Sequence, residues 1–266
     1  MDITAIIGII AGIGAILGAM YFKHLPLSVF NNPAAVLVIL VGTVACILNA
    51  FPGKDLKNLG KLFGILFTSD SKSANAKVEI IRTIDEFATV ARKEGILALE
   101  GRVDTLENEF MKKALRMVID GSAPEYIMDA LTLEMEEIEE RHNINASIFS
   151  QAGTYAPTLG VLGAVFGLIA AMNDINDTDA VAYAIAAAFI ATILGIFTGY
   201  VLWNPFANKL KVKNKHEMVE KRMMIEGIIS IQKGESPGLI KDKLTSFLSS
   251  SEKTMLPAAP EPGAAA

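Results

Sequence analysis

Cysteine, histidine and tryptophan are scarce in this 266-residue chain, and several common chemical signatures are missing from it. The single cysteine, Cys46, cannot form an intrachain disulfide or a Cys-rich metal site. The sequence has no phosphate-binding loop, no Ser/His/Asp order and no metal-ligand spacing, so we expect no enzyme activity, no cofactor and no bound metal. With a net charge of −5 it also lacks a long basic stripe, which argues against nucleic acid as a partner.

Charge is absent from four apolar stretches, and these stretches predict the fold. None contains Asp, Glu, Lys or Arg, and they cover residues 3–22, 34–51, 157–172 and 180–203. A helix needs roughly 20 mostly apolar residues to cross a bilayer, with about 17 as the short limit. The third stretch reaches that length if it begins a few residues before Pro157. The sequence therefore predicts an all-α integral membrane protein with four transmembrane helices in two hairpins and a helical cytoplasmic domain between spans two and three.

The distribution of lysine predicts the orientation of the spans. Lysines follow spans two and four, whereas the turn after span one offers only Lys23 and His24 and the turn after span three has no cation. These lysines are Lys54, Lys57, Lys61, Lys209, Lys211, Lys213 and Lys215. By the positive-inside rule, both termini and the insert are expected in the cytoplasm. We expect the first stretch to be retained, because Met1-Asp2 lacks the basic segment of a signal peptide.

Five segments follow from this topology. They are a transmembrane hairpin at 1–51, a cytoplasmic helical domain at 52–150, a transmembrane hairpin at 151–204, C-terminal cytoplasmic helices at 205–250 and a disordered tail at 251–266. The tail is rich in proline and alanine and has little apolar bulk to bury.

The insert shows the periodicity of helices. A first apolar stripe, with Gly95 as a plausible C-cap, contains Ile80, Ile81, Ile84, Phe87 and Ala88. A second helix is expected to carry Leu99, Val103, Leu106 and Phe110 on one face. The acidic helix after Pro124 could continue unbroken into span three, which would link cytoplasmic movement to the membrane mechanically.

Small residues recur along three of the spans. They are Gly8, Gly12, Gly14 and Gly18 in span one, Gly160, Gly163 and Gly167 in span three, and Ala187, Ala191, Gly195 and Gly199 in span four. In lipid, close contact across small residues holds helices together. These ladders either pack one chain's own helices or face neighbouring subunits or a partner helix, and four thin helices alone leave little room for a conduit.

Two prolines and one threonine are the unusual residues of the second hairpin. On a continuous helix, Pro157 and Pro205 would free the carbonyls of Gly153 and Val201, which protein or a water-lined cavity must then satisfy. The alternative is that they only start and stop helices, and we favour that interpretation for Pro205. The hydroxyl of Thr192 can bond back to its own helix, which is the commoner behaviour, or meet an ion or a carboxylate from outside the chain.

Four segments together carry a family resemblance. They are Ala91–Glu100 (ARKEGILALE), Ala156–Gly163 (APTLGVLG), Ala191–Gly195 (ATILG) and Asn204–Leu210 (NPFANKL). In this order and with this topology, the chain resembles the MotA/PomA family of flagellar motor stator proteins, which is related to TolQ and ExbB. The resemblance extends over nearly the whole chain up to the tail.

The resemblance implies a function and a set of partners. The chain is then expected to form a homopentameric ring in the lipid of the bacterial inner membrane, around transmembrane helices of MotB. MotB supplies the aspartate that binds the coupling ion, and the complex converts ion-motive force into torque on the rotor protein FliG.

The resemblance also assigns roles to residues. Thr192, Pro157 and Ala164 belong to the ion pathway, Pro157 and Pro205 couple ion flow to movement, and Arg92 and Glu100 engage the rotor with Lys93 as a helper. Sodium-driven relatives carry a threonine at the position of Ala164. A methyl group cannot coordinate sodium, so we expect the coupling ion to be the proton.

Two alternatives remain at this point. An energiser of the ExbB/TolQ type would drive an envelope-spanning partner, but such proteins usually have three spans and an external amino terminus, unlike the opening hairpin here. A passive scaffold without ion flow would not need the prolines and the threonine where they are.

Overall fold

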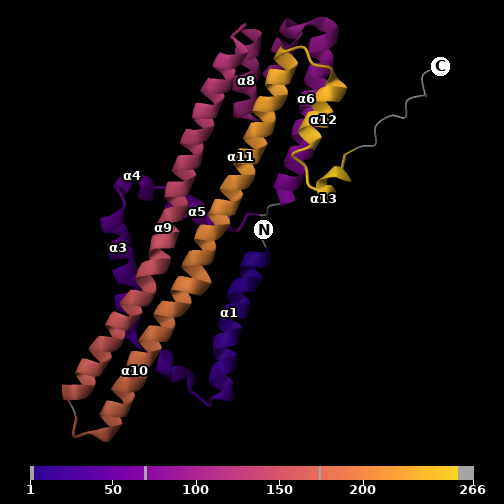
Figure 1. The fold of residues 1–266 in the computed structure, drawn as a ribbon. Helices are drawn as coiled ribbons and strands as arrows, with labels where there is room; N and C mark the ends of the chain where they lie inside the picture. Colours follow the sequence, from indigo (N-terminus) through magenta and orange to yellow (C-terminus); the bar gives the residue numbers. More distant parts are fainter. Residues whose placement is uncertain (1–2, 69–70, 174, 257–266) are drawn as a thin grey trace. The chain divides into compact units, whose positions relative to one another are not determined.

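The computed structural model describes residues 3–68, 71–173 and 175–256. All regular elements in these ranges are helices (Figure 1), as the sequence predicts. By tertiary contacts the chain forms two compact units, one from residues 1–69 and 141–212 and the other from 70–140 and 213–266. These units differ from the predicted segments, because helices near residues 53–66 join the first unit and the C-terminal helices complete the second.

The first unit contains the apolar helices. Its elements are α1 (Ile3–Phe22), the 3₁₀ helix η1 (Leu27–Phe30), α2 (Pro33–Val36), the π-helix η2 (Leu37–Val41), α3 (Gly42–Ala50), α4 (Gly53–Leu56), α5 (Leu59–Leu66), part of α9 (Pro124–Asn173), α10 (Thr178–Phe197), the π-helix η4 (Thr198–Trp203) and the start of α11 (Asn204–Gln232). Within the described residues, four helices are long and apolar enough to cross a membrane: Ile3–Phe22, Pro33–Ala50, and portions of Pro124–Asn173 and Thr178–Gln232. The four predicted spans are thus all present as helices.

At the turns between spans, polar side chains cap the first N–H groups of the helix that follows. The Asn32 side chain accepts a hydrogen bond from the N–H of Ala35 at the start of α2, where Pro33 provides a preset φ. The Asp177 side chain accepts from the N–H groups of Asp179 and Ala180 at the start of α10. Polar turns therefore satisfy the first orphan donors of each returning span.

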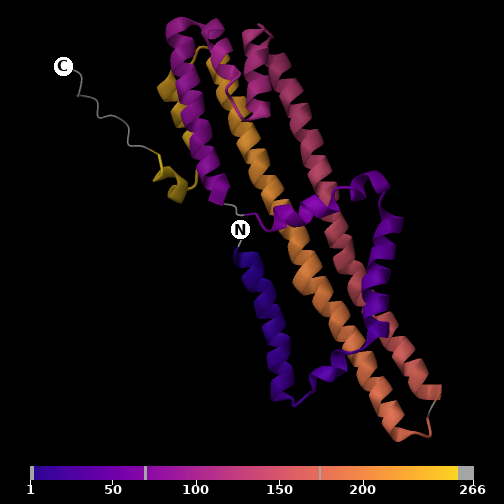
Figure 2. The ribbon, with the colours of Figure 1, turned by 180° about the vertical axis from the view of Figure 1, so that it is seen from behind.

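Helix α9 runs unbroken from Pro124 to Asn173, and it confirms that the acidic helix continues into span three. It lies beside α10 in antiparallel orientation in both views (Figures 1 and 2). Pro157 lies inside α9. The interpretation of Pro205 as a helix stop is wrong, because α10, η4 and α11 form one helical run from Thr178 to Gln232. The π turn immediately before Pro205 accommodates a residue that has no N–H to donate.

An aromatic cluster closes the first unit near the end of span four. The rings of Phe149, Trp203 and Phe206 lie 6.2–6.4 Å apart. Helix α5 covers them with the buried side chains of Leu62 and Leu66. Aromatic pairs of this kind contribute about 0.5–1.5 kcal/mol each beyond the burial of their area, so they stabilise this end of the helix pair.

The second unit has its own hydrophobic core. It is built from α6 (Ser71–Glu94), the 3₁₀ helix η3 (Ile96–Leu99), α7 (Glu100–Val103), α8 (Glu109–Ile119), the start of α9, most of α11, α12 (Pro237–Thr245) and α13 (Ser250–Lys253). Every member of the predicted first stripe is buried in this core. Gly95 ends α6 as predicted, with φ +88° and ψ 162°, an extended conformation with positive φ that glycine adopts without strain, and not the left-handed helical conformation of the usual C-cap.

The expected second helix of the insert is wrong as a single element. The chain is helical to Val103, turns, and begins again at Glu109, where the Asn108 side chain caps α8 by accepting from the N–H of Met111. Leu99, Val103 and Phe110 are nevertheless all buried, as the stripe predicts. The spacing of the apolar residues predicted their burial. It did not predict the break in the helix, where Asn108 starts a new helix as its N-cap.

The tail predicted to be disordered from residue 251 begins with an ordered helix. Ser249 forms a capping box with Glu252 at the start of α13, and Lys77 pairs with Glu252 at 3.1 Å. Residues 257–266 lie outside the described part of the chain.

Candidate functional site

Helices α9 and α10 are in backbone contact along their small residues. A Cβ atom added at Gly160 would lie 2.9 Å from the carbonyl oxygen of Ala191, and one added at Gly195 would lie 2.7 Å from that of Ala156. In glycine a hydrogen occupies the Cβ direction, so these positions place Cα–H groups against carbonyl oxygens of the facing helix, each a weak stabilising contact. The ladders of spans three and four therefore pack within one chain.

Span one behaves differently. Gly12 packs closely against Val201, but Cβ atoms added at Gly8, Gly14 or Gly18 would meet nothing within 4 Å. Of the two interpretations of the small-residue ladders, internal packing therefore holds for spans three and four, and the glycines of span one lie mostly on an open face.

Pro157 lies directly against η4. A Cβ added at Gly199 would come 2.7 Å from Cγ of Pro157 and 2.8 Å from the carbonyl oxygen of Gly153. The Gly153 carbonyl cannot receive an N–H from Pro157, and it faces a Cα–H of Gly199 instead. The two predicted coupling prolines thus lie on facing segments, since Pro205 follows η4 by two residues.

Pro205 itself is exposed. In the turn before it, the N–H of Asn204 donates to the carbonyl of Gly199, five residues earlier, as in a π-helix. Single π-turns inside α-helices are frequently found at functional sites. The structure therefore places both prolines where the regular helical hydrogen bonding of the second hairpin is interrupted.

The Thr192 side chain is half-buried, and its hydroxyl donates to the carbonyl of Ala188 at 3.4 Å. This long bond within the helix is easily exchanged for another acceptor. Ala164 is also half-buried and follows Gly163, whose added Cβ would lie 3.2 Å from Cβ of Ala191. Thr192 and Ala164 are therefore at the same level of the α9–α10 pair.

The predicted rotor-contact residues lie in the second unit. Arg92 and Lys93 are exposed in the last turn of α6, and Glu100 is exposed at the start of α7. Gly95 turns the chain between them. Within the described part of the chain, none of these three side chains forms an ion pair, so their charges are available to a partner.

Other charges of the second unit are paired internally. Lys243 on α12 contacts Glu226 at 2.9 Å and Glu235 at 3.2 Å. Burial raises the pKa of Glu235, but hydrogen bonds from Lys243 and Ser230 together with the lysine charge outweigh it and hold this pKa below its usual value. In another part of the second unit, Arg116 on α8 lowers the pKa of Asp104, first by a hydrogen bond and then by its charge.

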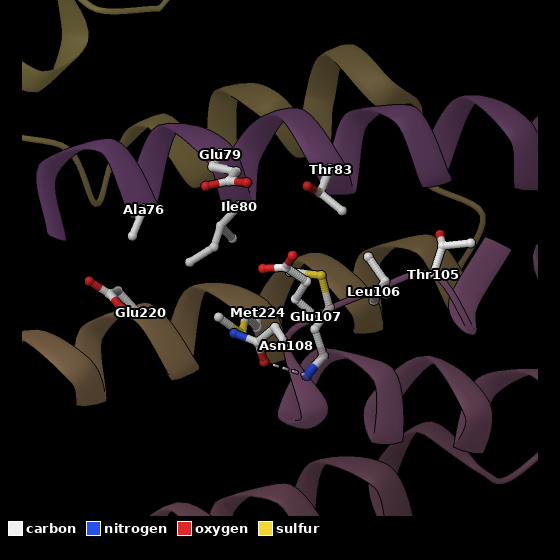
Figure 3. A pocket seen from close by; sticks show the side chains of 11 residues that line it. Ala76, Glu79, Ile80, Thr83, Thr105, Leu106, Glu107, Asn108, Glu220 and Met224 are labelled. Carbon is white, nitrogen blue, oxygen red and sulfur yellow. Dashed lines mark hydrogen bonds between the residues drawn. The ribbon is translucent and has the colours of Figure 1, made fainter. Parts of the chain in front are cut away.

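A cavity of about 330 Å³ opens between α6, α11 and the segment before α8 (Figure 3). Three carboxylates line it, those of Glu79, Glu107 and Glu220, and no lysine or arginine is among its described lining residues. None of the residues that the sequence assigns to the rotor contact or to the ion pathway lines this cavity. Sequence periodicity gave no signal for it, because its walls come from three distant segments.

These features define a class: an all-α, multi-pass membrane protein with two apolar hairpins and a helical insert. The model of the MotA/TolQ/ExbB proton channel family matches residues 102–223. The chain belongs to this family, which is one of membrane channels and not of enzymes.

Within the family, the chain is similar to the motility proteins. It is 47% identical to Motility protein A of Bacillus subtilis (strain 168) over 253 residues, covering 95% of this chain and 93% of the relative. It is 27% identical to Chemotaxis protein PomA of Vibrio alginolyticus, covering 96% and 98% of the two chains.

Solved structures agree with this placement. The flagellar MotAB stator complex from Bacillus subtilis contains a chain that matches with a TM-score of 0.87 and 45% identity, covering 96% of this chain and all of that one. The corresponding values for C. jejuni MotAB are a TM-score of 0.86 and 32% identity, with 94% and 97% covered. The resemblance predicted from the sequence is confirmed: the chain belongs to the family of the flagellar stator proteins.

Proposed function

We propose that this chain assembles with MotB as a homopentameric, proton-conducting ring in the bacterial inner membrane and applies torque to FliG. The main support is the absence of any Asp, Glu, Lys or Arg from all four apolar stretches. A proton pathway needs a group that can be protonated inside the membrane, so that group has to come from another polypeptide. The relatives solved as MotAB complexes make MotB the natural donor.

A carboxyl group supplied in this way would act as a switch. As an anion in apolar surroundings it is costly, and as the neutral acid it is not, so burial raises its pKa. Each protonation changes how the partner helix fits against the ring. One charge that crosses a potential of 100 mV releases roughly 2.3 kcal/mol, enough to bias states that differ by a few kcal/mol.

We assign the ion pathway to Thr192, Pro157 and Ala164 on the α9–α10 pair. The Thr192 hydroxyl is held only by a 3.4 Å bond and can turn to an incoming carboxyl group or water. Ala164 offers no oxygen, which favours the proton over sodium as coupling ion.

We assign the coupling role to Pro157 and Pro205. Both lie inside helical runs that continue far beyond the apolar spans, to Pro124 on one side and Gln232 on the other. A bend at either proline is therefore transmitted along a hydrogen-bonded helix. Arg92, Glu100 and Lys93 would then meet the rotor as exposed charges worth about 0–1 kcal/mol per pair, which suits contacts that form and release at every step.

We further propose that both termini and the insert are cytoplasmic, because the lysines follow spans two and four. A complementation experiment tests the function as a whole. The chain is expressed with its cognate partner in a motile bacterium that lacks its own stator, and swimming is measured with sodium replaced by potassium at constant pH. We expect motility that does not depend on sodium, whereas motility that vanishes without sodium would refute the proton assignment.

A further inference from the structure

A groove lies between α1 and the end of span four, and it is separate from the proposed ion pathway. Its volume is about 400 Å³, within the range of small-molecule sites. Thr4, Ala5, Gly8 and Ile9 line one side, and Tyr200, Val201, Pro205, Phe206 and Lys209 line the other. All of these residues belong to the first unit.

The groove exists because the two helices separate there. At Gly12 they touch, since an added Cβ would lie 2.6 Å from Cγ1 of Val201. One turn nearer the amino terminus, an added Cβ at Gly8 would meet nothing within 4 Å. Ala5 also contributes only a methyl group to the wall, so no side chain of the lining fills the gap.

The lining changes in character along its length. Gly8, Ile9 and Val201 come from the apolar stretches and form an apolar wall. Toward the amino terminus of α1 the wall gains the hydroxyl of Thr4, and beyond span four it gains Lys209, the first cation after that span. Tyr200 precedes Val201 and lines the other, apolar end of the groove. Lys209 is half-buried and lines the groove beyond the last residues of span four, so the groove ends beside a cationic side chain.

This change from an apolar wall to a cationic end matches a phospholipid, which has apolar acyl chains and a phosphate headgroup. A space beside helices at membrane depth is filled by acyl chains, because water has no partners there. In the orientation proposed above, Lys209 lies at the headgroup level of the cytoplasmic leaflet, which carries the anionic lipids. We propose that the groove is a binding site for one anionic phospholipid, with an acyl chain along Gly8 and Val201 and the phosphate at Lys209.

The fluorescence of Trp203 can report whether a lipid occupies the groove. Trp203 is the only tryptophan of the chain, and together with Ile9 it packs against the buried cluster that contains Phe206. A lipid in the groove would bring its acyl chain close to this indole. Bromine atoms on an acyl chain quench tryptophan fluorescence at short range, so occupancy can be read directly.

The test uses the intact stator complex reconstituted into phosphatidylcholine vesicles. Brominated phosphatidylglycerol and brominated phosphatidylcholine are added at equal mole fraction, and a Trp203→Phe complex measures the partner's own fluorescence for subtraction. We expect an apparent preference of about five-fold for the anionic lipid, the scale of one lysine–phosphate contact near the membrane surface.

Two variants with matched controls locate the effect. Gly8→Leu should abolish the preference by filling the groove, whereas Gly14→Leu, also in open space on α1, should not. Lys209→Gln should remove the preference, whereas Lys211→Gln, an exposed lysine outside the groove, should retain it.

Equal quenching by both lipids, preference that survives Gly8→Leu, or equal losses in the two lysine variants would each overturn the proposal. If a neighbouring copy of the chain fills the groove instead, Gly8→Leu will break up the oligomer in native mass spectrometry and the wild type will show no preference. Quenching reports neither ion flow nor torque, so a failure here leaves the stator function intact, and a failure of complementation leaves this result intact.

Discussion

The ring of Pro157 lies so close to Gly199 that a Cβ atom at position 199 would approach its Cγ to 2.7 Å. The same Cβ would lie 2.8 Å from the carbonyl of Gly153, the group whose hydrogen bond Pro157 removes. One contact thus joins a proline inside α9 to the π-helical turn that precedes the other proline. A change of curvature at Pro157 therefore acts directly on the segment before Pro205.

This contact predicts the effect of filling position 199. Gly199→Leu should separate α9 from η4 at a cost of about 1–3 kcal/mol, the usual range for overpacking, and should abolish motility. Thermal unfolding of the purified protein and swimming of the complemented strain measure the two effects. Gly18→Leu is the matched control, because it meets open space in span one. If both variants behave alike, the contact has no special role.

A second prediction concerns the hydroxyl of Thr192. Thr192→Val keeps the shape and removes the oxygen, and it should cost less than about 1 kcal/mol of stability because the existing bond is long. Motility should nevertheless fall strongly, and Thr192→Ser should restore most of it. Equal motility of the valine variant and the wild type would remove Thr192 from the ion pathway.

Substitution of the exposed charges Arg92 and Glu100 should lower motility and leave the stability of the protein nearly unchanged. Arg92→Glu and Glu100→Lys should change the unfolding free energy by no more than about 0.5 kcal/mol, because both side chains are exposed, while each lowers swimming speed. Glu125→Lys, another exposed charge of the second unit, is the matched control and should swim normally. A control that swims as poorly as the two variants would show that net charge, and not these residues, matters.

The Lys243 cluster predicts a pH-dependent stability. Because the folded pKa of Glu235 is lowered, its contribution is present above the ordinary value of 4.5 and is lost as the pH falls through the lowered value. Lys243→Met should therefore cost about 0.5–1 kcal/mol near neutral pH after allowance for solvent screening. Melting curves of the variant and the wild type should converge in strong acid, and a constant difference at all pH values would contradict this account.

Apolar periodicity was enough to predict much of the fold. It placed all four spans and the buried stripe of α6, because burial depends on residue type at a regular spacing. It failed at Asn108, where a local cap interrupts the helix, and at Pro205, where a π turn lets the helix continue. These outcomes depend on backbone hydrogen bonds, and the spacing of apolar residues carries no information about those bonds.

The candidate site was predictable in its residue types and not in its contacts. The sequence singled out Pro157, Gly199 and Thr192, but the register between α9 and α10 decides which of them meet. That register depends on which small residues interlock across the two helices, a tertiary property. The acidic cavity beside α6 was missed for the same reason, since its lining comes from separate segments.

Proton flux into vesicles tests the central claim most directly. Vesicles carry the chain alone, the chain with its cognate MotB, or the chain with a MotB variant whose membrane aspartate is replaced by asparagine, and an internal pH dye follows an imposed potential. We predict flux only for the complex with the intact aspartate, because the spans of this chain contain no ionisable carboxyl or cationic group. Flux from the chain alone, at a rate equal to that of the complex, would contradict the account.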